Sequence, residues 1–183
     1  MLTPDEVRKI YHEAERLYSN EEVQSALDNM ASDIERDFAD KLPVVLPVMA
    51  GAVIVTGHLM TRLSFPLEIN YIHATRYAND TKGGEISWLA KPTVDLDGRA
   101  VIILDDIIDE GITLDKIVEY CKNEGASEVA CAVLIDKKHD RKKGALQADY
   151  VGLEIEDRYI FGYGMDYKGY LRNADGIYAV KGL

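Results

Sequence analysis

The stretch VIILDDIIDEGITL, residues 101–114, runs from apolar residues into two adjacent aspartates, two further acids, a glycine and a threonine. The apolar run Ala100–Leu104 predicts a strand that is buried on both faces. The apolar spacing that follows predicts a helix that starts near Thr113 and ends at Gly125. Residues 105–112 are therefore expected in the loop at the carboxyl end of a parallel strand, where open α/β sheets bind ligands.

The residue types in this loop suit a sugar phosphate. Gly111 lets backbone N–H groups converge, Thr113 offers a hydroxyl, and the start of a helix carries partial positive charge. The carboxylates of Asp105 and Asp106 suit ribose hydroxyls, or Mg²⁺ and its waters. A separate carboxylate, Asp109, suits a general base. The alternative is an acidic turn that only stabilises the start of a helix.

Apolar runs elsewhere in the chain alternate with helix-like stretches. The runs are Val44–Met49, Leu67–His73, Ala100–Leu104, Val129–Ile135 and Tyr150–Glu154, and the helix-like stretches lie near Ala52–Leu63 and Thr113–Glu124. This alternation predicts an α/β fold with parallel strands. Pro47 removes a ladder donor, so its strand is expected at an edge or with a bulge. No repeat or linker interrupts the sequence, which indicates one domain.

Two helices are predicted before the first strand. Thr3 and Glu6 form a capping box at the start of the first helix, whose apolar spacing continues to Tyr18. Ser19 begins the same pattern again, and the second helix is expected to continue to Phe38.

The composition is that of an acidic globular protein. The chain has 183 residues, 47% of them hydrophobic and 29% charged, with a formal net charge of −11. Such a charge repels nucleic acid and anionic membranes, so neither is expected as a partner. It also repels phosphorylated metabolites, so a phosphate site requires a local cradle and a divalent cation.

Several segments bear on location. Cys121 and Cys131 have no CxxC spacing, which favours a reducing cytosol over a disulfide framework. The acidic, helical N-terminal segment is not typical of a signal peptide. The uncharged stretch Leu42–Thr61 approaches the length of a membrane span, but two early prolines and Gly51 favour a buried strand, a turn and a buried helix. A cytoplasmic protein is therefore expected.

Residues 101–114 closely resemble the 5-phosphoribosyl-1-pyrophosphate (PRPP) signature of the type I phosphoribosyltransferases: two hydrophobic residues, two acids, two hydrophobic residues, then Asp-x-Gly-x-Thr. Over nearly its full length the chain resembles the hypoxanthine-guanine branch. The stretch DYVGLEIEDRYIFGYGMDYKGYLRN, residues 149–173, resembles the purine-binding hood of that branch.

The resemblance implies a fold and a reaction. The fold is a mainly parallel sheet flanked by helices, in one domain over residues 1–183. A small hood is formed by parts of the segment from about 150 to 183 and by the N-terminal helices. The reaction transfers the phosphoribosyl group of PRPP to N9 of hypoxanthine or guanine, which gives IMP or GMP and pyrophosphate in purine salvage.

The resemblance also implies roles within the loop. Asp105 and Asp106 match the pair that engages the ribose hydroxyls and the metal shell, and Asp109 matches the catalytic base near purine N7. Glu110 departs from the pattern, because many relatives carry threonine there, and its side chain is expected to point away from the phosphate. The residues that match the 5′-phosphate cradle are Asp109, Glu110, Gly111, Ile112 and Thr113.

In the hood, Tyr159 matches the aromatic that stacks on the purine, and Ile160 matches the residue whose backbone meets the base edge. Asp166, at the purine end of the site, matches the carboxylate that coordinates the Mg²⁺ bound to pyrophosphate. Arg172 matches the arginine that holds pyrophosphate oxygens. Without the resemblance, the aromatics predict a core strand, and Asp166 with Arg172 predicts a surface ion pair.

A lysine is expected to donate to the purine O6, and two neighbours compete for that role. Lys137 and Lys138 differ by one residue in the alignment. We favour Lys137, because relatives place this lysine directly after the acid at the end of the strand.

Two further loops match the family less well. Ala50 stands where many relatives have lysine or arginine in the pyrophosphate loop, before Gly51, and relatives hold a cis peptide there. Tyr77 matches a tyrosine of the mobile lid that contacts pyrophosphate. Arg76 replaces the usual serine, and we hypothesise that it supplies the charge that Ala50 lacks. Without the resemblance, residues 74–88 predict a hairpin with a glycine-rich tip.

The leading hypothesis is a Mg²⁺-dependent enzyme with PRPP and a 6-oxopurine as substrates. The family and the apolar helix Ala52–Met60 indicate a homo-oligomer, either a dimer or a tetramer. One alternative is a regulator of the same fold that senses nucleotides and controls nucleic-acid binding, which the net charge of −11 disfavours. Another is a transferase that prefers xanthine. The four histidines share no metal-ligand spacing, and none is assigned a role.

Overall fold

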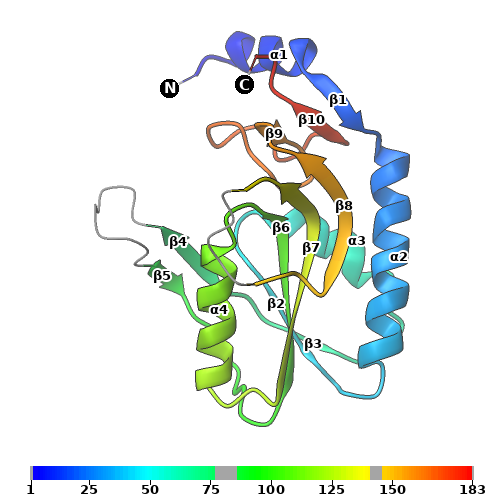
Figure 1. Cartoon of the computed structure of the whole chain (residues 1–183), viewed down its shortest axis with the longest axis vertical. Helices are drawn as coiled ribbons and strands as arrows, with labels where there is room; N and C mark the ends of the chain where they lie inside the picture. Colours follow the sequence, from blue (N-terminus) through cyan, green and yellow to red (C-terminus); the bar gives the residue numbers. More distant parts are fainter. Residues whose placement is uncertain (1, 77–85, 141–145, 183) are drawn as a thin grey trace.

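The computed structural model describes residues 2–76, 86–140 and 146–182 (Figure 1). The helices are α1 (Pro4–Glu13), α2 (Asn20–Phe38), α3 (Val53–Met60) and α4 (Ile112–Asn123). The strands are β1 (Glu15–Tyr18), β2 (Val44–Pro47), β3 (Glu68–Ile69), β4 (His73–Arg76), β5 (Ile86–Ala90), β6 (Ala100–Ile108), β7 (Glu128–Lys138), β8 (Tyr150–Glu156), β9 (Ile160–Phe161) and β10 (Ile177–Ala179).

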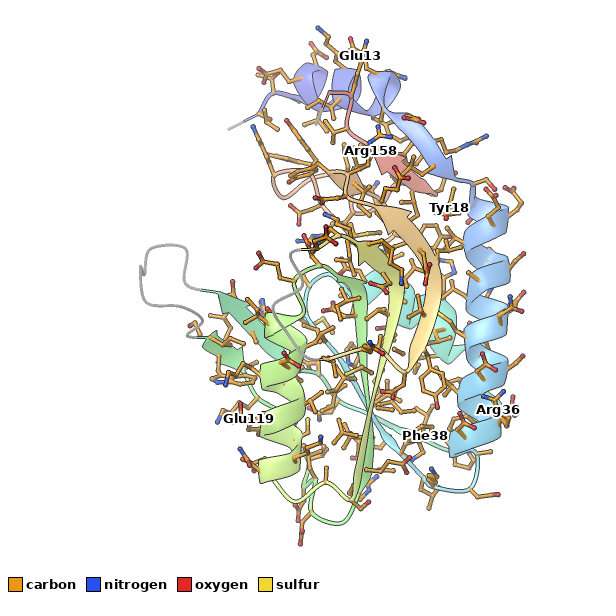
Figure 2. The ribbon with its side chains drawn as sticks, in the orientation of Figure 1. Glu13, Tyr18, Arg36, Phe38, Glu119 and Arg158 are labelled. Carbon is orange, nitrogen blue, oxygen red and sulfur yellow. The ribbon has the colours of Figure 1, made fainter. Side chains whose placement is uncertain are left out.

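A five-stranded parallel sheet, in the order β3-β2-β6-β7-β8, forms the centre of the molecule and confirms the predicted α/β fold. Helices α2 and α3 cover one face, and α4 covers the other (Figure 1). In β6, Ile102 and Leu104 pack in the same core cluster as Phe38 at the end of α2, whose side chain Figure 2 labels. Val101 and Ile103 pack in the cluster beneath α4, so this strand is buried on both faces as expected.

The expectation that Pro47 marks an edge strand or a bulge is wrong. Strand β2 lies between β3 and β6, and Pro47 pairs in register with Leu104. The Pro47 carbonyl accepts a hydrogen bond from the Ile72 N–H at 3.0 Å. Since the N–H and C=O of a residue in a parallel strand point to the same side, the missing donor faces residues 70–72, where the ladder is interrupted between Ile69 and the bridge of Val48 with Ile72. The proline therefore removes one hydrogen bond of this ladder, while the bonds on either side of it remain.

A small antiparallel sheet, β1-β10-β9, lies beside the carboxyl ends of the central strands (Figure 1). The two predicted capping boxes, at Thr3 and Ser19, are present. The first helix was expected to reach Tyr18 but ends at Glu13, because strand β1 (Glu15–Tyr18) pairs with β10. The Tyr18 hydroxyl also donates to the Glu154 carbonyl at 2.7 Å. Helix α1 packs with this small sheet, whereas α2 packs on the central one.

Within the described ranges, no helix is long and apolar enough to cross a membrane. The uncharged stretch of residues 42–61 forms β2, a turn and the eight-residue helix α3, as predicted. Strand β4 pairs antiparallel with β5, and residues 77–85 between them lie outside the described part of the chain.

Candidate active site

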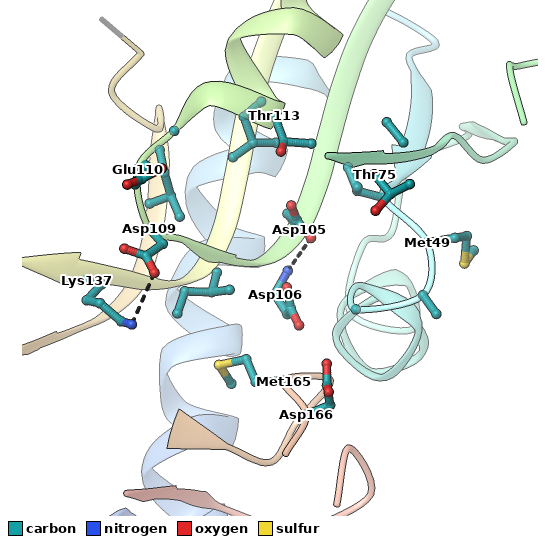
Figure 3. A pocket seen from close by; sticks show the side chains of 18 of the residues that line it. Met49, Thr75, Asp105, Asp106, Asp109, Glu110, Thr113, Lys137, Met165 and Asp166 are labelled. Atoms are coloured by element: carbon teal, nitrogen blue, oxygen red, sulfur yellow. Dashed lines mark hydrogen bonds and ion pairs between the residues drawn. The ribbon is translucent and has the colours of Figure 1, made fainter. Parts of the chain in front are cut away.

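A cavity of about 560 Å³ opens where the central sheet meets the small sheet (Figure 3). Its walls come from the carboxyl ends of β6 and β7, the loop after β2, strand β4, the start of α4 and the loops of the small sheet. The residues that line it are Val48, Met49, Ala50, Gly51, His73, Ala74, Thr75, Asp105, Asp106, Ile107, Ile108, Asp109, Glu110, Gly111, Ile112, Thr113, Leu114, Lys137, Tyr159, Ile160, Met165, Asp166 and Arg172.

Two adjacent carboxylates, those of Asp105 and Asp106, line this cavity. Strand β6 continues to Ile108, so the expectation that the loop begins at Asp105 is wrong: pairing with β7 holds the strand together to its end. The Asp106 N–H donates to Asp105 Oδ1 at 2.9 Å, and Asp106 is 7% exposed. Burial and the neighbouring Asp106 charge raise the pKa of Asp105 well above its ordinary value. Burial likewise raises the pKa of Asp106.

The start of helix α4 is open to an anion. Its N-cap is Gly111, at φ +80°, and no side chain caps the helix, in contrast to the capping boxes of α1 and α2. Ile112 and Thr113, in the first turn, line the cavity. Glu110 lines it as well, and its carboxylate lies on the side of the loop away from Thr113 (Figure 3). Unclaimed N–H groups and the helix dipole suit a phosphate here.

Asp109 is held by two side chains from the end of β7. Lys137 Nζ lies 3.2 Å from Asp109 Oδ2, and His139 Nε2 lies 2.5 Å from Asp109 Oδ1. Partial burial pushes the pKa of Asp109 upward, but the His139 hydrogen bond and the Lys137 charge outweigh it, so that the pKa is lowered. The carboxylate is therefore ionised, as a proton acceptor must be.

The side chains of Lys137 and Lys138 point in different directions at the end of β7. Lys137 is 8% exposed and lines the cavity. Lys138 points to the opposite side, where it pairs with Asp136 at 2.8 Å and Glu154 at 2.7 Å. Successive side chains of a strand alternate in direction, so only one of the two can reach the cavity. The structure brings Lys137, not Lys138, to the site.

The hood residues close the far side of the cavity. Arg172 Nη2 lies 2.6 Å from Asp166 Oδ1, and the Gly169 N–H donates to Asp166 Oδ2 at 2.6 Å. This pair faces the cavity, which a solvated surface ion pair would not. Tyr159 is 42% exposed and packs edge-on against Tyr167, with 5.6 Å between ring centroids. Its ring thus has an accessible face.

Ile160, next in the chain, is buried in β9, where it pairs with Ala179. Its backbone is fixed by the small sheet at the cavity wall. The interpretation of Tyr159 as part of a closed aromatic core does not fit its exposure, whereas it does describe Phe161, which is fully buried.

The loop after β2 carries the predicted cis peptide, between Met49 and Ala50. Gly51 lies directly against the carboxyl group of Asp106, because a Cβ at this position would be 2.5 Å from Asp106 Oδ2. Ala50 lines the cavity without adding charge. Tyr77 lies outside the described residues, so the structure does not place it.

The carboxylates of the cavity suit a Mg²⁺ ion that is also bound by the phosphates of a substrate. Within the described ranges, no group of three or more His, Cys, Asp or Glu side chains could hold a metal ion alone. Mg²⁺ is commonly held by one or two carboxylates together with substrate phosphates, rather than by a cage made only of protein. The three acids Asp105, Asp106 and Asp166 all line the cavity and fit that arrangement.

The sequence pattern missed some residues of the site. His139 is one of them, because the four histidines share no metal-ligand spacing that would predict a role. Its position two residues after Lys137 was the available signal, since this spacing places both side chains on one side of an extended segment. Thr75 and Met165 also line the cavity, and no local pattern distinguishes them.

These features define a class: an α/β protein that binds a sugar phosphate at the carboxyl edge of a parallel sheet. Residues 13–168 match the family model described as the phosphoribosyl transferase domain. The chain is 31% identical to the hypoxanthine-guanine phosphoribosyltransferase of Bacillus subtilis (strain 168), over 93% of this chain and 95% of that protein. It is 30% identical to the hypoxanthine-guanine-xanthine phosphoribosyltransferase of Tritrichomonas foetus, over 86% of each chain.

Solved structures agree with this match. A crystal structure of a hypoxanthine-guanine phosphoribosyltransferase from Bacillus anthracis superposes with a TM-score of 0.86 at 33% identity, covering 91% of this chain and 98% of that one. The fold is that of the type I phosphoribosyltransferases. The chain belongs to the phosphoribosyltransferase family, in its hypoxanthine-guanine branch.

Proposed function

We propose that the protein transfers the 5-phosphoribosyl group of PRPP to N9 of hypoxanthine or guanine, which yields IMP or GMP and pyrophosphate in purine salvage. The observation that carries this proposal is a continuous cavity of about 560 Å³. It joins the loop at the end of β6 with Lys137 and with the hood residues Tyr159 and Asp166, which lie far apart in the sequence. The reactions named for the relatives support the same assignment.

The PRPP half of the site is the edge of β6. The uncapped start of α4, with the Thr113 hydroxyl, binds the 5′-phosphate through backbone N–H groups. Asp105 and Asp106 accept hydrogen bonds from the ribose hydroxyls. During transfer the bond from C1′ to pyrophosphate breaks and a bond from C1′ to N9 forms. Positive charge develops on the ribose, so fixed carboxylates nearby stabilise it.

The leaving pyrophosphate lies between the hood and the loop after β2, residues 48–52, which carries the cis peptide and is called the cis loop below. Ala50 and Gly51 offer backbone N–H groups, Arg172 contacts the pyrophosphate oxygens, and Tyr77 contacts pyrophosphate from the lid. Mg²⁺ supplies positive charge that stabilises the leaving pyrophosphate when the ion is bound. The residues that would hold the ion are Asp105, Asp106 and Asp166.

The purine half of the site selects a 6-oxopurine. Tyr159 stacks on the ring with its accessible face, and the backbone of Ile160 meets the base edge. The Lys137 ammonium can only donate, so it favours the 6-oxo group over the amino group of adenine. Asp109 accepts the proton of purine N7 as general base.

Further properties belong to the same proposal. Residues 1–183 form one phosphoribosyltransferase domain, which the family match over residues 13–168 supports. The protein is a homo-oligomer, a dimer or a tetramer, which the exposed Val53 on the apolar helix α3 supports. It acts in the cytoplasm, in keeping with two buried free cysteines, Cys121 and Cys131.

A panel of bases with PRPP and Mg²⁺, followed by chromatography of the nucleotide products, tests the proposal. We expect products from hypoxanthine and guanine and none from adenine. No product from any 6-oxopurine would contradict it. Xanthine is included because the Tritrichomonas foetus relative carries xanthine in its name, and faster turnover of xanthine would favour that second candidate. A gel shift with DNA and RNA tests the regulator alternative, which the net charge of −11 disfavours.

A further inference from the structure

Both oxygens of one carboxylate in the cavity are held by different side chains. Lys137 Nζ lies 3.2 Å from Asp109 Oδ2, and His139 Nε2 lies 2.5 Å from Asp109 Oδ1. The side chain of Lys137 is 11% exposed and that of His139 only 4%, whereas that of Asp109 is 40% exposed. The carboxylate thus faces the cavity, while the imidazole that contacts it is almost fully shielded from solvent.

The strand geometry explains why these two side chains converge. Strands β6 and β7 are parallel neighbours, and Ile108 pairs with Asp136 in register. The next residue of each chain segment is Asp109 on one side and Lys137 on the other. His139 follows Lys137 by two positions and so lies on the same side of the extended backbone. The position of His139 is therefore a consequence of the fold.

The proposed function gives Lys137 two competing tasks. Without substrate its ammonium holds Asp109, but a bound 6-oxopurine requires the same ammonium at O6. When Lys137 turns to the purine, Asp109 Oδ2 loses this contact at the moment when it must be aimed at N7. A base that is free to rotate loses the alignment that proton transfer needs. A second contact is required to keep it in place.

We propose that His139 is a positioning residue, which holds Asp109 Oδ1 so that Oδ2 stays directed at purine N7 once Lys137 has moved to O6. This inference rests on the proposed function. Because an ionised carboxylate only accepts hydrogen bonds, His139 Nε2 carries the proton in this contact. The N7–H bond of the purine breaks, an O–H bond forms at Asp109 Oδ2, and the hydrogen bond from His139 to Oδ1 is kept throughout.

Other charged groups surround this pair among the described residues. Asp157, after β8, lies 3.9 Å from Lys137 Nζ, so it also attracts the ammonium away from Asp109. Glu110 follows Asp109 in the same loop and carries a like charge. Neither contact replaces the one that His139 makes to Oδ1.

Steady-state kinetics of His139→Ala and His139→Gln test the inference, with His12→Ala, on the exposed helix α1, as control. We expect His139→Ala to lower kcat roughly 10- to 100-fold, the factor that corresponds to one hydrogen bond to a charged group. The KM for PRPP should stay unchanged, and His139→Gln, which keeps a donor, should recover part of kcat. His12→Ala should match the wild type.

The pH profile separates positioning from a structural role. His139 lowers the pKa of Asp109, and activity requires the ionised form. In His139→Ala the acidic limb of the kcat profile should therefore move to higher pH, which a general loss of packing would not produce. In an Asp109→Asn background, His139→Ala should have no further effect on kcat, because it acts through the absent carboxylate.

An unchanged kcat with an unchanged acidic limb in both His139 variants would overturn the inference, as would a full additional loss in the Asp109→Asn background. The wild-type assay reports on the proposed function separately: absence of nucleotide product there would overturn that function. A ¹³C NMR titration of the Asp109 carboxyl in the free protein tests the contact without any reaction. Its pKa should rise in His139→Ala, and an unchanged pKa would contradict the contact.

Discussion

Gly164 of the hood lies directly against the carbonyl oxygen of Gly51 in the cis loop. A Cβ at Gly164 would be 2.1 Å from that oxygen and 3.1 Å from the Cβ of Asp106. The hood, the cis loop and the end of β6 therefore meet at one point, with no room for a side chain. The φ of Gly164, +110°, also disfavours any residue with a Cβ. This contact fixes the distance between the two halves of the cavity.

Gly164→Ala should consequently damage both stability and activity. Overpacking together with the positive φ predicts a loss of roughly 2–4 kcal/mol in the free energy of unfolding, measured by urea denaturation. The matched control is Gly57→Ala in α3, where a Cβ meets nothing within 4 Å. That change should stabilise the protein by about 0.5–1 kcal/mol, since alanine is the better helix former. Equal changes in the free energy of unfolding for the two variants would show that the contact of Gly164 with the Gly51 carbonyl is unimportant.

Lys137→Ala should weaken purine affinity much more than PRPP affinity. The ammonium lines the cavity and is the expected donor to O6, so its loss removes a hydrogen bond to the base. The KM for hypoxanthine should rise on the order of tenfold or more, while the KM for PRPP stays nearly constant. Lys138→Ala is the control, because that lysine pairs with Asp136 and Glu154 on the other side of β7. A larger rise of the KM for hypoxanthine in Lys138→Ala than in Lys137→Ala would assign the donor to O6 to Lys138 instead.

Asp105→Asn should stabilise the protein without substrate while it removes activity. Burial raises the pKa of Asp105 in the folded state above that of the unfolded chain, near 4. The folded state then binds more protons, so the stability contributed by this group is present below pH of about 4 and lost as pH rises through the raised pKa. Thermal unfolding with chelator present should show a higher Tm for Asp105→Asn at neutral pH and little difference near pH 4. A lower Tm at neutral pH would refute this.

Arg76→Ala should raise the apparent KM for PRPP. Ala50 provides no charge in the pyrophosphate loop, and Arg76 ends β4, directly after Thr75 at the cavity wall. We expect the substitution to weaken PRPP binding several-fold, and more at low salt, because a cation attracts pyrophosphate. Arg8→Ala, on the exposed helix α1, is the control. Unchanged PRPP affinity in Arg76→Ala would contradict the hypothesis that Arg76 supplies the positive charge that Ala50 lacks.

Local patterns predicted the parts of the fold that local forces decide. The capping boxes at Thr3 and Ser19 and the doubly buried run in β6 depend on neighbours in the sequence, and the structure confirms them. The errors arise where distant segments decide. Tyr18 lies in a strand because β10 is available to pair with it. Pro47 lies inside the sheet because the segment after β3 bonds to β2 on either side of the missing donor. Local periodicity does not predict either of these pairing segments.

In the candidate site, too, features that depend on neighbouring residues were predictable, whereas features that depend on distant segments were not. The predicted phosphate cradle lies within one short stretch, and its residues line the cavity. The extension of β6 through Asp105 and Asp106 depends on the pairing with β7, which held the strand beyond its apolar run. The contact of His139 with Asp109 joins residues thirty positions apart, and only the register of two strands brings them together.

The role of Asp109 in phosphoribosyl transfer is tested by the rate of IMP formation from hypoxanthine, PRPP and Mg²⁺, measured for the wild type and for Asp109→Asn. We expect the wild type to form IMP. Asp109→Asn should lower kcat roughly 10²- to 10⁴-fold, with little change in either KM, as for a lost general base. Equal kcat values for the two proteins would show that Asp109 is not the base.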